Sequence, residues 1–385
     1  MSGNSNRWRW AAVLAVAVAL VAPAPAQAEA REQQADQHAR TKALLDQYLA
    51  HAGPGAAVYA GDGSGTWNLS SGSASASTAR PIQPTDHFRV GSQTKTFTAA
   101  VVLQLVDEGL VDLDAPIERY LPGVVAGNGY DGNVITVRQI LRHTSGIAST
   151  LGAVRANPDG TYALAELVRA GLANPPQFAP GTSYGYSNVN YYLAGMLIER
   201  LTGQDARTVI TNRIIHPLGL AETTFPAPGD RSLATPYLPG YEGGRLGPLF
   251  FWYEKTFSLE MSQYSTAGAI TSTQPDLVAF ERALADGKVV SDQALAQMRQ
   301  TVVVPQAPRL RYGLGLTHIA LSCGGEAWGH GGDIPTGHTS LTMVTDDGRF
   351  ASLVTNAMVS NDTTPTRYDV IDAALCETGA AEQRG

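Results

Sequence analysis

Ser92 and Lys95 show the first chemically suggestive spacing in this 385-residue sequence. They begin and end the motif Ser-Gln-Thr-Lys, which follows a strand-like stretch and leads into an apolar helical run. On a helix, residues three positions apart lie on one face, so the Lys95 amine can reach the Ser92 hydroxyl. A serine hydroxyl becomes a good nucleophile when a neighbouring base removes its proton, and a helix N-terminus favours developing negative charge. The alternative is a helix-capping serine beside a surface lysine.

Tyr186 and Asn188 form a second motif, Tyr-Ser-Asn, shortly after the turn residues Pro180 and Gly181. A phenolate is favoured by a nearby positive charge, so Tyr186 beside a lysine is a candidate general base. Asn188 could then hydrogen-bond Lys95 or a substrate amide. A tyrosine that only packs in the core is the alternative.

The third motif is Gly329-His330-Gly331-Gly332-Asp333, between strand-like segments. Glycines in a strand often mark close approach by another backbone or by a ligand. Such a strand could supply one half of an oxyanion hole, with the backbone N–H of Ser92 as the other half. His330 could instead be an ordinary hydrogen-bonded core residue.

The overall composition is that of a globular protein. Acidic residues number 34 against 27 basic ones, the net charge is -7, and 44% of residues are hydrophobic. This balance is too apolar for a disordered chain and too acidic for a nucleic-acid-binding protein. No repeat of fixed period appears, which excludes solenoids and propellers. The length fits one two-lobed domain or two domains.

Residues 1–28 have the pattern of a signal peptide. Arg7 and Arg9 precede an apolar run at 11–22, and Ala26-Gln27-Ala28 fits a cleavage site. The run is too short to span a bilayer, although a membrane anchor or a buried helix is the alternative. We therefore expect a secreted protein, in the extracellular or cell-wall space, that begins near Glu29 and has no integral membrane segment after cleavage.

Cys323 and Cys376 are the two cysteines of the chain. In an oxidising compartment such a pair favours one structural disulfide, and neither cysteine has neighbours that suggest a metal or redox site. Two free buried thiols are the alternative, because spacing alone does not establish geometry.

The apolar pattern predicts a sheet with an inserted helical lobe. Helices are predicted at 32–49, 97–106, 163–170, 191–201, 206–215, 275–285 and 367–376. Strands are predicted at 55–60, 66–71, 312–321, 339–344 and 350–356. Because strands occur at both ends, we expect a sheet lobe from about 29–90 and 267–380 and a mostly helical lobe at about 91–266. The predicted fold class is α/β (α+β), an antiparallel sheet flanked by helices.

The three motifs, in this order, resemble those of the penicillin-recognising serine hydrolases, which include serine β-lactamases and D-alanyl-D-alanine peptidases. The stretches 88–92, 105–109, 143–146 and 312–316 look like those of secreted D-alanyl-D-alanine carboxypeptidases and their class C β-lactamase relatives. The resemblance covers nearly all of residues 29–385 and implies one β-lactamase/transpeptidase-like domain.

By this resemblance, Ser92 is the acylated nucleophile and Lys95 its proton acceptor. Tyr186 would shuttle protons, and Asn188 and His330 would position the substrate. The substrate would be a small peptide, a D-amino-acid derivative or a β-lactam, with no metal and no organic cofactor. The resemblance implies no oligomeric state.

Two positions depart from the carboxypeptidase pattern. Where that pattern has a threonine after His-x-Gly and an arginine on the preceding strand, this chain has Asp333 and Thr317. An aspartate near the site would repel a substrate carboxylate and attract an amine. This feature favours a D-aminopeptidase, D-amino-acid amidase or esterase of the same superfamily, unless Asp333 instead forms a salt bridge with Arg309 or Arg311.

Other functions fit the sequence less well than a D-alanyl-D-alanine carboxypeptidase-like hydrolase. The stretch 181–185 matches the nucleophile elbow of α/β-hydrolases, but prolines precede it where that fold needs a buried strand. A penicillin sensor that is acylated only once normally needs a membrane-spanning transmitter. A class C-like β-lactamase is the remaining alternative.

Overall fold

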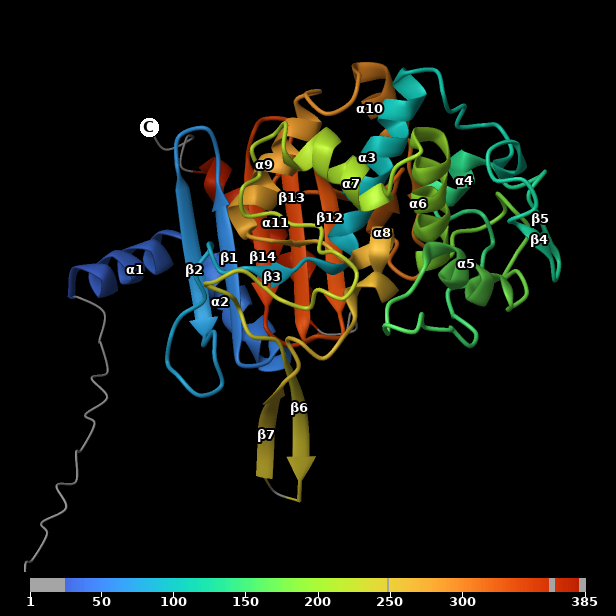
Figure 1. The fold of residues 1–385 in the computed structure, drawn as a ribbon. Helices are drawn as coiled ribbons and strands as arrows, with labels where there is room; N and C mark the ends of the chain where they lie inside the picture. The colour runs from blue at the N-terminus through green and yellow to red at the C-terminus, as the bar shows by residue number, and fades with distance from the viewer. Residues whose placement is uncertain (1–24, 248, 360–363, 381–385) are drawn as a thin grey trace, which may run out of the picture.

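Segments from the two ends of the chain build one antiparallel sheet of eight strands. The computed structural model describes residues 25–247, 249–359 and 364–380. The strand order is β2-β1-β14-β13-β12-β11-β10-β9, and all seven pairings are antiparallel (Figure 1). The strands are β1 (Gly55–Gly61), β2 (Thr66–Gly72), β9 (Val302–Val303), β10 (Leu310–Tyr312), β11 (Thr317–Ala320), β12 (Glu326–Ile334), β13 (His338–Thr345) and β14 (Phe350–Thr355). This arrangement confirms the predicted fold class.

Helices cover both faces of this sheet. The helices are α1 (Pro25–Gln37), α2 (Ala39–Ala52), α3 (Thr94–Asp107), α4 (Val137–Leu141), α5 (Leu164–Leu172), α6 (Asn188–Thr202), α7 (Ala206–Ile210), α8 (Ser265–Gly268), α9 (Gln274–Ala285), α10 (Asp292–Met298) and α11 (Arg367–Ala380). One apolar core lies between the sheet and helices α2 and α11. A larger core extends from the opposite face into α3, α6 and their neighbours, which form the broad end of the molecule in Figure 1.

Short strand pairs lie outside the main sheet. They are β3 (Phe88–Arg89) with β8 (Thr271–Ser272), β4 (Ala126–Gly127) with β5 (Tyr130–Asp131), and β6 (Tyr241–Leu246) with β7 (Leu249–Glu254). The first pair matters most for the site, because β3 is followed directly by the Ser92 motif.

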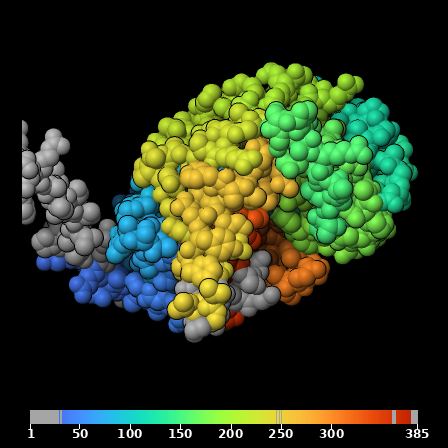
Figure 2. Space-filling model, turned by 60° about the horizontal axis from the view of Figure 1, so that its bottom comes forward, coloured from blue at the N-terminus to red at the C-terminus, as the bar shows by residue number. Residues whose placement is uncertain are grey.

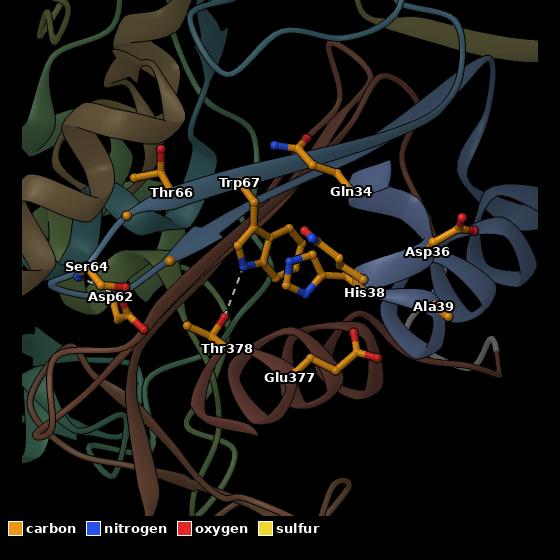
Figure 3. A pocket seen from close by; sticks show the side chains of 13 residues that line it. Gln34, Asp36, His38, Ala39, Asp62, Ser64, Thr66, Trp67, Glu377 and Thr378 are labelled. Atoms are coloured by element: carbon orange, nitrogen blue, oxygen red, sulfur yellow. Dashed lines mark hydrogen bonds between the residues drawn. The ribbon is translucent and has the colours of Figure 1, made fainter. Parts of the chain in front are cut away.

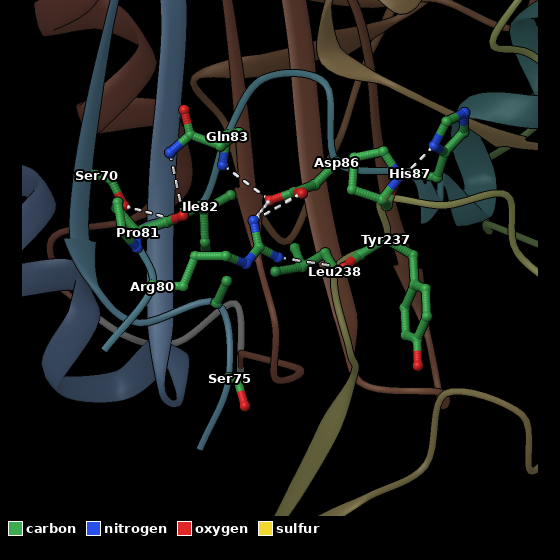
Figure 4. A network of polar contacts seen from close by, with 12 residues as sticks. Ser70, Ser75, Arg80, Pro81, Ile82, Gln83, Asp86, His87, Tyr237 and Leu238 are labelled. Atoms are coloured by element: carbon green, nitrogen blue, oxygen red, sulfur yellow. Dashed lines mark hydrogen bonds and ion pairs between the residues drawn. The ribbon is translucent and has the colours of Figure 1, made fainter. Parts of the chain in front are cut away.

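A polar network fixes the chain on its way into β3 (Figure 4). Arg80 donates two hydrogen bonds of 2.8 Å to the buried carboxylate of Asp86. The Arg80 guanidinium also reaches the carbonyl of Tyr237, and Nδ1 of His87 contacts the carbonyl of Pro236 at 2.9 Å. These contacts connect the loop before β3 to the 236–238 segment and so hold β3 in place.

The predicted helix at 32–49 is two helices. His38 adopts non-helical angles (φ -120°, ψ 46°) between α1 and α2. Its ring stacks on Trp67 with centroids 3.8 Å apart, and Trp67 donates to Thr378 of α11 (Figure 3). The stack joins the helix break to β2 and α11 beside a surface cavity. Helical periodicity continues through the break, so the pattern alone does not reveal it.

Some strands also differ from the prediction. The predicted strand at 312–321 is divided into β10 and β11, because Gly315 adopts a φ of 75° and the Gly313 N–H bonds the Leu316 carbonyl. Helix α10 and the β6–β7 hairpin were not predicted as elements, and for β12 the prediction was limited to the glycine motif at 329–333 and gave no bounds. Strand β12 holds three glycines and polar residues, which weaken the usual strand signal.

Residues 1–24 of the predicted signal peptide lie outside the described residues, and α1 begins at Pro25. None of the helices in the described ranges combines the length and the apolar character that crossing a membrane requires. Cys323 and Cys376 form a disulfide across 53 positions, which joins the turn after β11 to α11. This finding confirms the predicted pairing and leaves no free thiols.

Candidate active site

Ser92 lies in a one-turn 3-10 helix, Gly91–Gln93, between β3 and α3. Gly91 has a φ of 56°, a conformation that favours glycine, and it turns the chain sharply out of the strand. Ser92 is partly exposed while its neighbours on both sides are buried. The turn therefore presents the hydroxyl to a cavity from the start of a rigid, buried helix.

Lys95 is completely buried beneath Ser92. Its Nζ donates to Ser92 Oγ at 3.0 Å, to Asn188 Oδ1 at 2.8 Å and to the Ala267 carbonyl at 2.7 Å. Burial lowers the pKa of Lys95 well below its usual value, because a desolvated ammonium is destabilised. A neutral amine donates only two of these three hydrogen bonds. In that state Asn188 and Ala267 accept from Nζ, while the Ser92 hydroxyl donates to it, so Nζ can accept the Ser92 proton. The structure thus brings Ser92, Lys95 and Asn188 together, as the helical spacing and the resemblance predict.

Tyr186 precedes α6, whose first turn is capped by the Ser187 side chain. The Lys95 Nζ lies 4.8 Å from the centre of the Tyr186 ring, and the phenol hydrogen-bonds Ser92. Burial raises the pKa of Tyr186 well above its usual value, outweighing the hydrogen bond from Ser92. The resting phenol is therefore protonated, so the expectation of a stabilised phenolate is wrong. The ammonium that would stabilise a phenolate is itself disfavoured by burial.

The glycines of β12 allow this strand to contact the Ser92 turn directly. A Cβ atom on Gly332 would lie 1.8 Å from the Val90 carbonyl oxygen, and one on Gly91 would lie 2.8 Å from the Asp333 carbonyl oxygen. No side chain fits at these positions without displacing backbone. The close approach predicted for the glycine motif is therefore to another backbone, and it sets β12 beside Ser92.

His330 lies on β12 with its ring at the cavity wall. It is buried, and its Nε2 accepts a hydrogen bond from the Tyr312 hydroxyl at 2.9 Å. Burial lowers the pKa of His330 to about 3, so the ring is neutral at physiological pH. His330 thus combines both of the predicted alternatives: it is hydrogen-bonded in the core, and it lines the site.

Asp333 also lines the cavity, and its carboxylate is paired with Arg367 of α11. The guanidinium donates at 3.2 Å to one carboxylate oxygen and at 2.9 Å to the other, and Thr339 donates at 2.7 Å. The predicted alternative of a salt bridge was right in kind, but its partner is neither Arg309 nor Arg311. Arg311 bonds Thr301 instead.

Thr317 begins β11, where it pairs with Gly329, and it lies at the cavity wall. Its hydroxyl hydrogen-bonds Tyr368, the residue after Arg367. The arginine missing from β11 is thus replaced at this wall by one from α11. The sequence offers no signal for this substitution, because residues 317 and 367 are fifty positions apart and belong to different elements.

The cavity over Ser92 has a volume of about 740 Å³. Tyr186, Asn188 and His330 line it together with Ser92, and residues of segment 304–310, of β11 and of the start of α11 also belong to its lining. Two guanidinium groups belong to the described lining, those of Arg309 and Arg367. Each is paired with a carboxylate, because Arg309 donates to Asp369 at 3.1 Å.

His143 is a residue of the site whose role was not predicted. Its Nδ1 accepts from the backbone N–H of Ser187 and contacts the Asn190 amide, and its ring centre lies 4.3 Å from that of Tyr186. Within the described part of the chain, its Nε2 has no hydrogen-bond partner. Burial lowers the pKa of His143 well below its usual value. A neutral His143 therefore positions the loop that carries Tyr186. The motif at 143–146 was the available signal.

Ser183, the serine of the elbow-like pattern, is exposed in the loop before α6. No described strand precedes it directly, since the nearest described strand before it in the chain is β5. The α/β-hydrolase alternative is therefore excluded.

Together the fold and the site define a serine hydrolase of the β-lactamase and penicillin-binding superfamily. The sequence pattern described as Beta-lactamase matches residues 41–375, and the chain belongs to this family. Penicillin-binding protein 4 of Amycolatopsis lactamdurans is 30% identical over 339 residues, or 84% of this chain and 86% of that protein. Protein flp of Staphylococcus aureus (strain N315) is 31% identical over 149 residues, and the match spans only 30% of that protein.

Two solved structures are similar over almost their whole length. A D-stereospecific amidohydrolase from Streptomyces sp. is 40% identical with a TM-score of 0.76, covering 88% of this chain and 98% of that one. The D-amino acid amidase from Ochrobactrum anthropi SV3, complexed with D-phenylalanine, is 26% identical with a TM-score of 0.77, covering 90% and 99%.

Proposed function

We propose that this protein hydrolyses amides of D-amino acids through an acyl-enzyme on Ser92, and that it disfavours substrates whose leaving group has a free carboxylate. The observation that carries the proposal is the Asp333–Arg367 pair in the wall of the cavity. This choice is the predicted alternative, in place of a D-alanyl-D-alanine carboxypeptidase.

The pairing of the cavity's guanidinium groups argues against a carboxylate leaving group. A peptide carboxylate is best bound by an arginine that offers both N–H groups of its fork. Here the Arg367 fork is directed at Asp333, and the Asp333 side chain is the more exposed of the two, at 29% against 10%. An incoming carboxylate would meet a like charge, whereas ammonia or a neutral amine would meet none.

Acylation follows from the positions of Ser92 and Lys95. The neutral Lys95 amine accepts the Ser92 proton as Oγ attacks the amide carbon, and the carbonyl π electrons move to the oxygen. The backbone N–H groups of Ser92 and of the adjacent β12 backbone are the candidates to stabilise that oxyanion. As the C–N bond breaks, the protonated Tyr186 or the Lys95 ammonium donates a proton to the departing nitrogen.

Deacylation uses the same groups in reverse. A water molecule loses a proton to Lys95, or to Tyr186 if the phenol gave up its proton, and attacks the Ser92 ester. The second tetrahedral adduct collapses, the proton returns to Ser92 Oγ, and the D-amino acid leaves. Asn188 keeps the Lys95 amine aligned through both steps, since its Oδ1 accepts from Nζ at 2.8 Å.

The D configuration of the substrate is supported by the two structural neighbours, whose names specify D-stereospecific amidohydrolase and D-amino acid amidase activities. The Streptomyces neighbour is the stronger support, because it is 40% identical and the match covers 98% of its chain.

A substrate panel tests the proposal. The panel contains D-phenylalanine amide, L-phenylalanine amide, a peptide ending in D-Ala-D-Ala, a short-chain ester and a cephalosporin. We expect turnover of the D-amide above that of the L-amide and of the peptide, and no turnover by Ser92→Ala. Ser183→Ala is the matched control, because it removes an exposed serine hydroxyl in a loop and should keep full activity. Faster hydrolysis of the D-Ala-D-Ala peptide than of the D-amide would refute the proposal.

We also propose that the protein is exported, on the strength of the leader pattern in residues 1–28. The Cys323–Cys376 disulfide is in keeping with an oxidising compartment. N-terminal sequencing of the protein from culture medium should give a start near Glu29. Accumulation of the uncleaved chain in the cytoplasm would contradict export.

A further inference from the structure

The β6–β7 hairpin projects from the body of the molecule below the sheet (Figures 1 and 2). Its strands are in register, with Leu246 opposite Leu249, Gly244 opposite Phe251 and Glu242 opposite Tyr253. In an antiparallel pair, directly opposed residues share a face, and alternate residues along a strand return to it. Leu246, Leu249, Phe251 and Tyr253 therefore form one face, here called the hairpin face.

The hairpin face is apolar and exposed. Leu246 is 72% exposed, Leu249 67%, Phe251 45% and Tyr253 42%. The Phe251 ring lies over Gly244, so closely that a Cβ there would come within 2.7 Å of it. A two-stranded hairpin is marginally stable by itself. Leaving four apolar side chains exposed to water also forgoes the favourable free energy that their burial would give. Such a surface on a projecting element indicates an interaction site.

Along the hairpin face, polarity increases from tip to base. The two leucines flank the turn at the tip, and Phe251 follows. Tyr253 comes next and hydrogen-bonds Glu242, which in turn forms an ion pair with Lys255 at the base. From base to tip, the hairpin face runs from charges through a tyrosine to hydrocarbon. This is the order of layers met when entering a lipid bilayer from water.

The size of the hairpin face argues against a second protein copy. Four side chains at these exposures present on the order of 400 Å². A stable protein interface needs about 800 Å² from each partner. Insertion into a lipid surface has no such threshold, because the bilayer surrounds the whole tip.

We propose that the hairpin face inserts into the hydrocarbon boundary of a zwitterionic lipid surface and holds the enzyme there. The charges argue against a mainly electrostatic attachment: Lys255 is paired with Glu242, the formal charges of Arg245 and Glu254 cancel, and the chain carries a net charge of -7. Binding therefore depends on buried apolar area and not on anionic headgroups. No described residue of the hairpin lines the cavity over Ser92, so attachment leaves that cavity accessible.

Flotation with phosphatidylcholine vesicles tests the proposal on the purified mature protein. We expect the wild type to float with the vesicles, equally with and without anionic lipid and at high salt. Leu246→Glu/Phe251→Glu should lower the partition coefficient at least tenfold. Leu110→Glu is the matched control, because Leu110 is 48% exposed beyond the end of α3 and should be replaceable without effect.

Folding of each variant is checked by its melting curve and by β-lactam labelling of Ser92, which the hairpin does not contact. A wild type that stays in the aqueous fraction would overturn the proposal, as would equal flotation of the double variant. Light scattering gives a third decisive result: a wild-type dimer that the double variant reduces to a monomer would assign the hairpin face to a second copy. A monomer that floats is the expected result.

Discussion

Replacing Asp333 with threonine should move the enzyme's leaving-group preference toward carboxylates. The change removes the carboxylate that now occupies the fork of Arg367, at 2.9 and 3.2 Å. The guanidinium, 10% exposed, would then face the cavity without the Asp333 carboxylate in its fork. A substrate carboxylate could take the place of Asp333, and its repulsion by Asp333 would disappear at the same time.

The size of the effect follows from the charges at the cavity wall. Two unit charges 4 Å apart interact by about 4 kcal/mol at an effective dielectric constant of 20. Because the Asp333 side chain is 29% exposed, solvent reduces this value, and we take about 1–2 kcal/mol as the gain for a carboxylate. That gain corresponds to a change in rate ratio of roughly 5–30-fold.

Two substrates with the same acyl group isolate the leaving group. The assay compares kcat/KM for N-acetyl-D-alanyl-D-alanine with that for N-acetyl-D-alanine amide, in the wild type and in Asp333→Thr. The ratio should rise by the stated factor. Asp333→Asn should raise it too, because the amide keeps an acceptor for Thr339 while losing the charge.

Arg309→Gln is the control for a general change of charge in the cavity. Arg309 lies at the same wall, but its side chain is 73% exposed, so its removal should change the ratio less than about twofold. Melting curves and β-lactam labelling show whether each variant is folded. An unchanged ratio in folded, labelled Asp333→Thr and Asp333→Asn would refute the argument and make the ion pair purely structural.

Three further predictions concern the base, the β12 backbone and the disulfide. Lys95→Arg should lower kcat by about 10²–10⁴, because arginine stays protonated. Wild-type kcat/KM should fall as the pH drops through the depressed pKa of Lys95, since the ammonium accepts no proton. A pH-rate profile of the wild type and of Lys95→Arg measures both effects. Activity retained by Lys95→Arg would contradict the role of Lys95 as the base. Gly332→Ala should reduce kcat at least about tenfold by displacing β12 from the Ser92 turn. Gly63→Ala is the control, because a Cβ at Gly63 meets open space and should leave kcat unchanged. Stopped-flow acylation rates of the two variants test this difference. Replacing Cys323 and Cys376 by serine should lower the free energy of unfolding by up to about 4 kcal/mol for the 53-residue separation, measured in urea, and an unchanged midpoint would rule this out.

The amino-acid sequence was sufficient to predict the parts of the protein that depend on local geometry. A helix places residues three apart on one face, so the spacing of Ser92 and Lys95 predicted that they can pair, while a capping serine beside a surface lysine was the alternative. Short strand-like runs next to turn residues indicated β1, β2, β13 and β14, and their positions at both ends of the chain predicted a shared sheet. The order of the three motifs indicated the superfamily.

Local reasoning was weaker where one residue serves two requirements. Strand β12 needs glycine to approach Val90 closely, and the same glycines weaken the apolar pattern from which a strand is predicted. His38 interrupts a helix whose apolar periodicity continues on both sides, and its ring stacks on Trp67 of β2, a contact between elements that helical periodicity does not predict.

The electrostatics of the site, in contrast, depend on tertiary packing. The pKa shifts of Lys95 and Tyr186 arise from burial, which depends on how α3, α6 and β12 pack together. The partner of Asp333 comes from α11, 34 positions away, where two nearer arginines had seemed equally suitable. Charge pairing and desolvation depend on distances in space between elements remote in sequence, and spacing along the chain does not encode those distances.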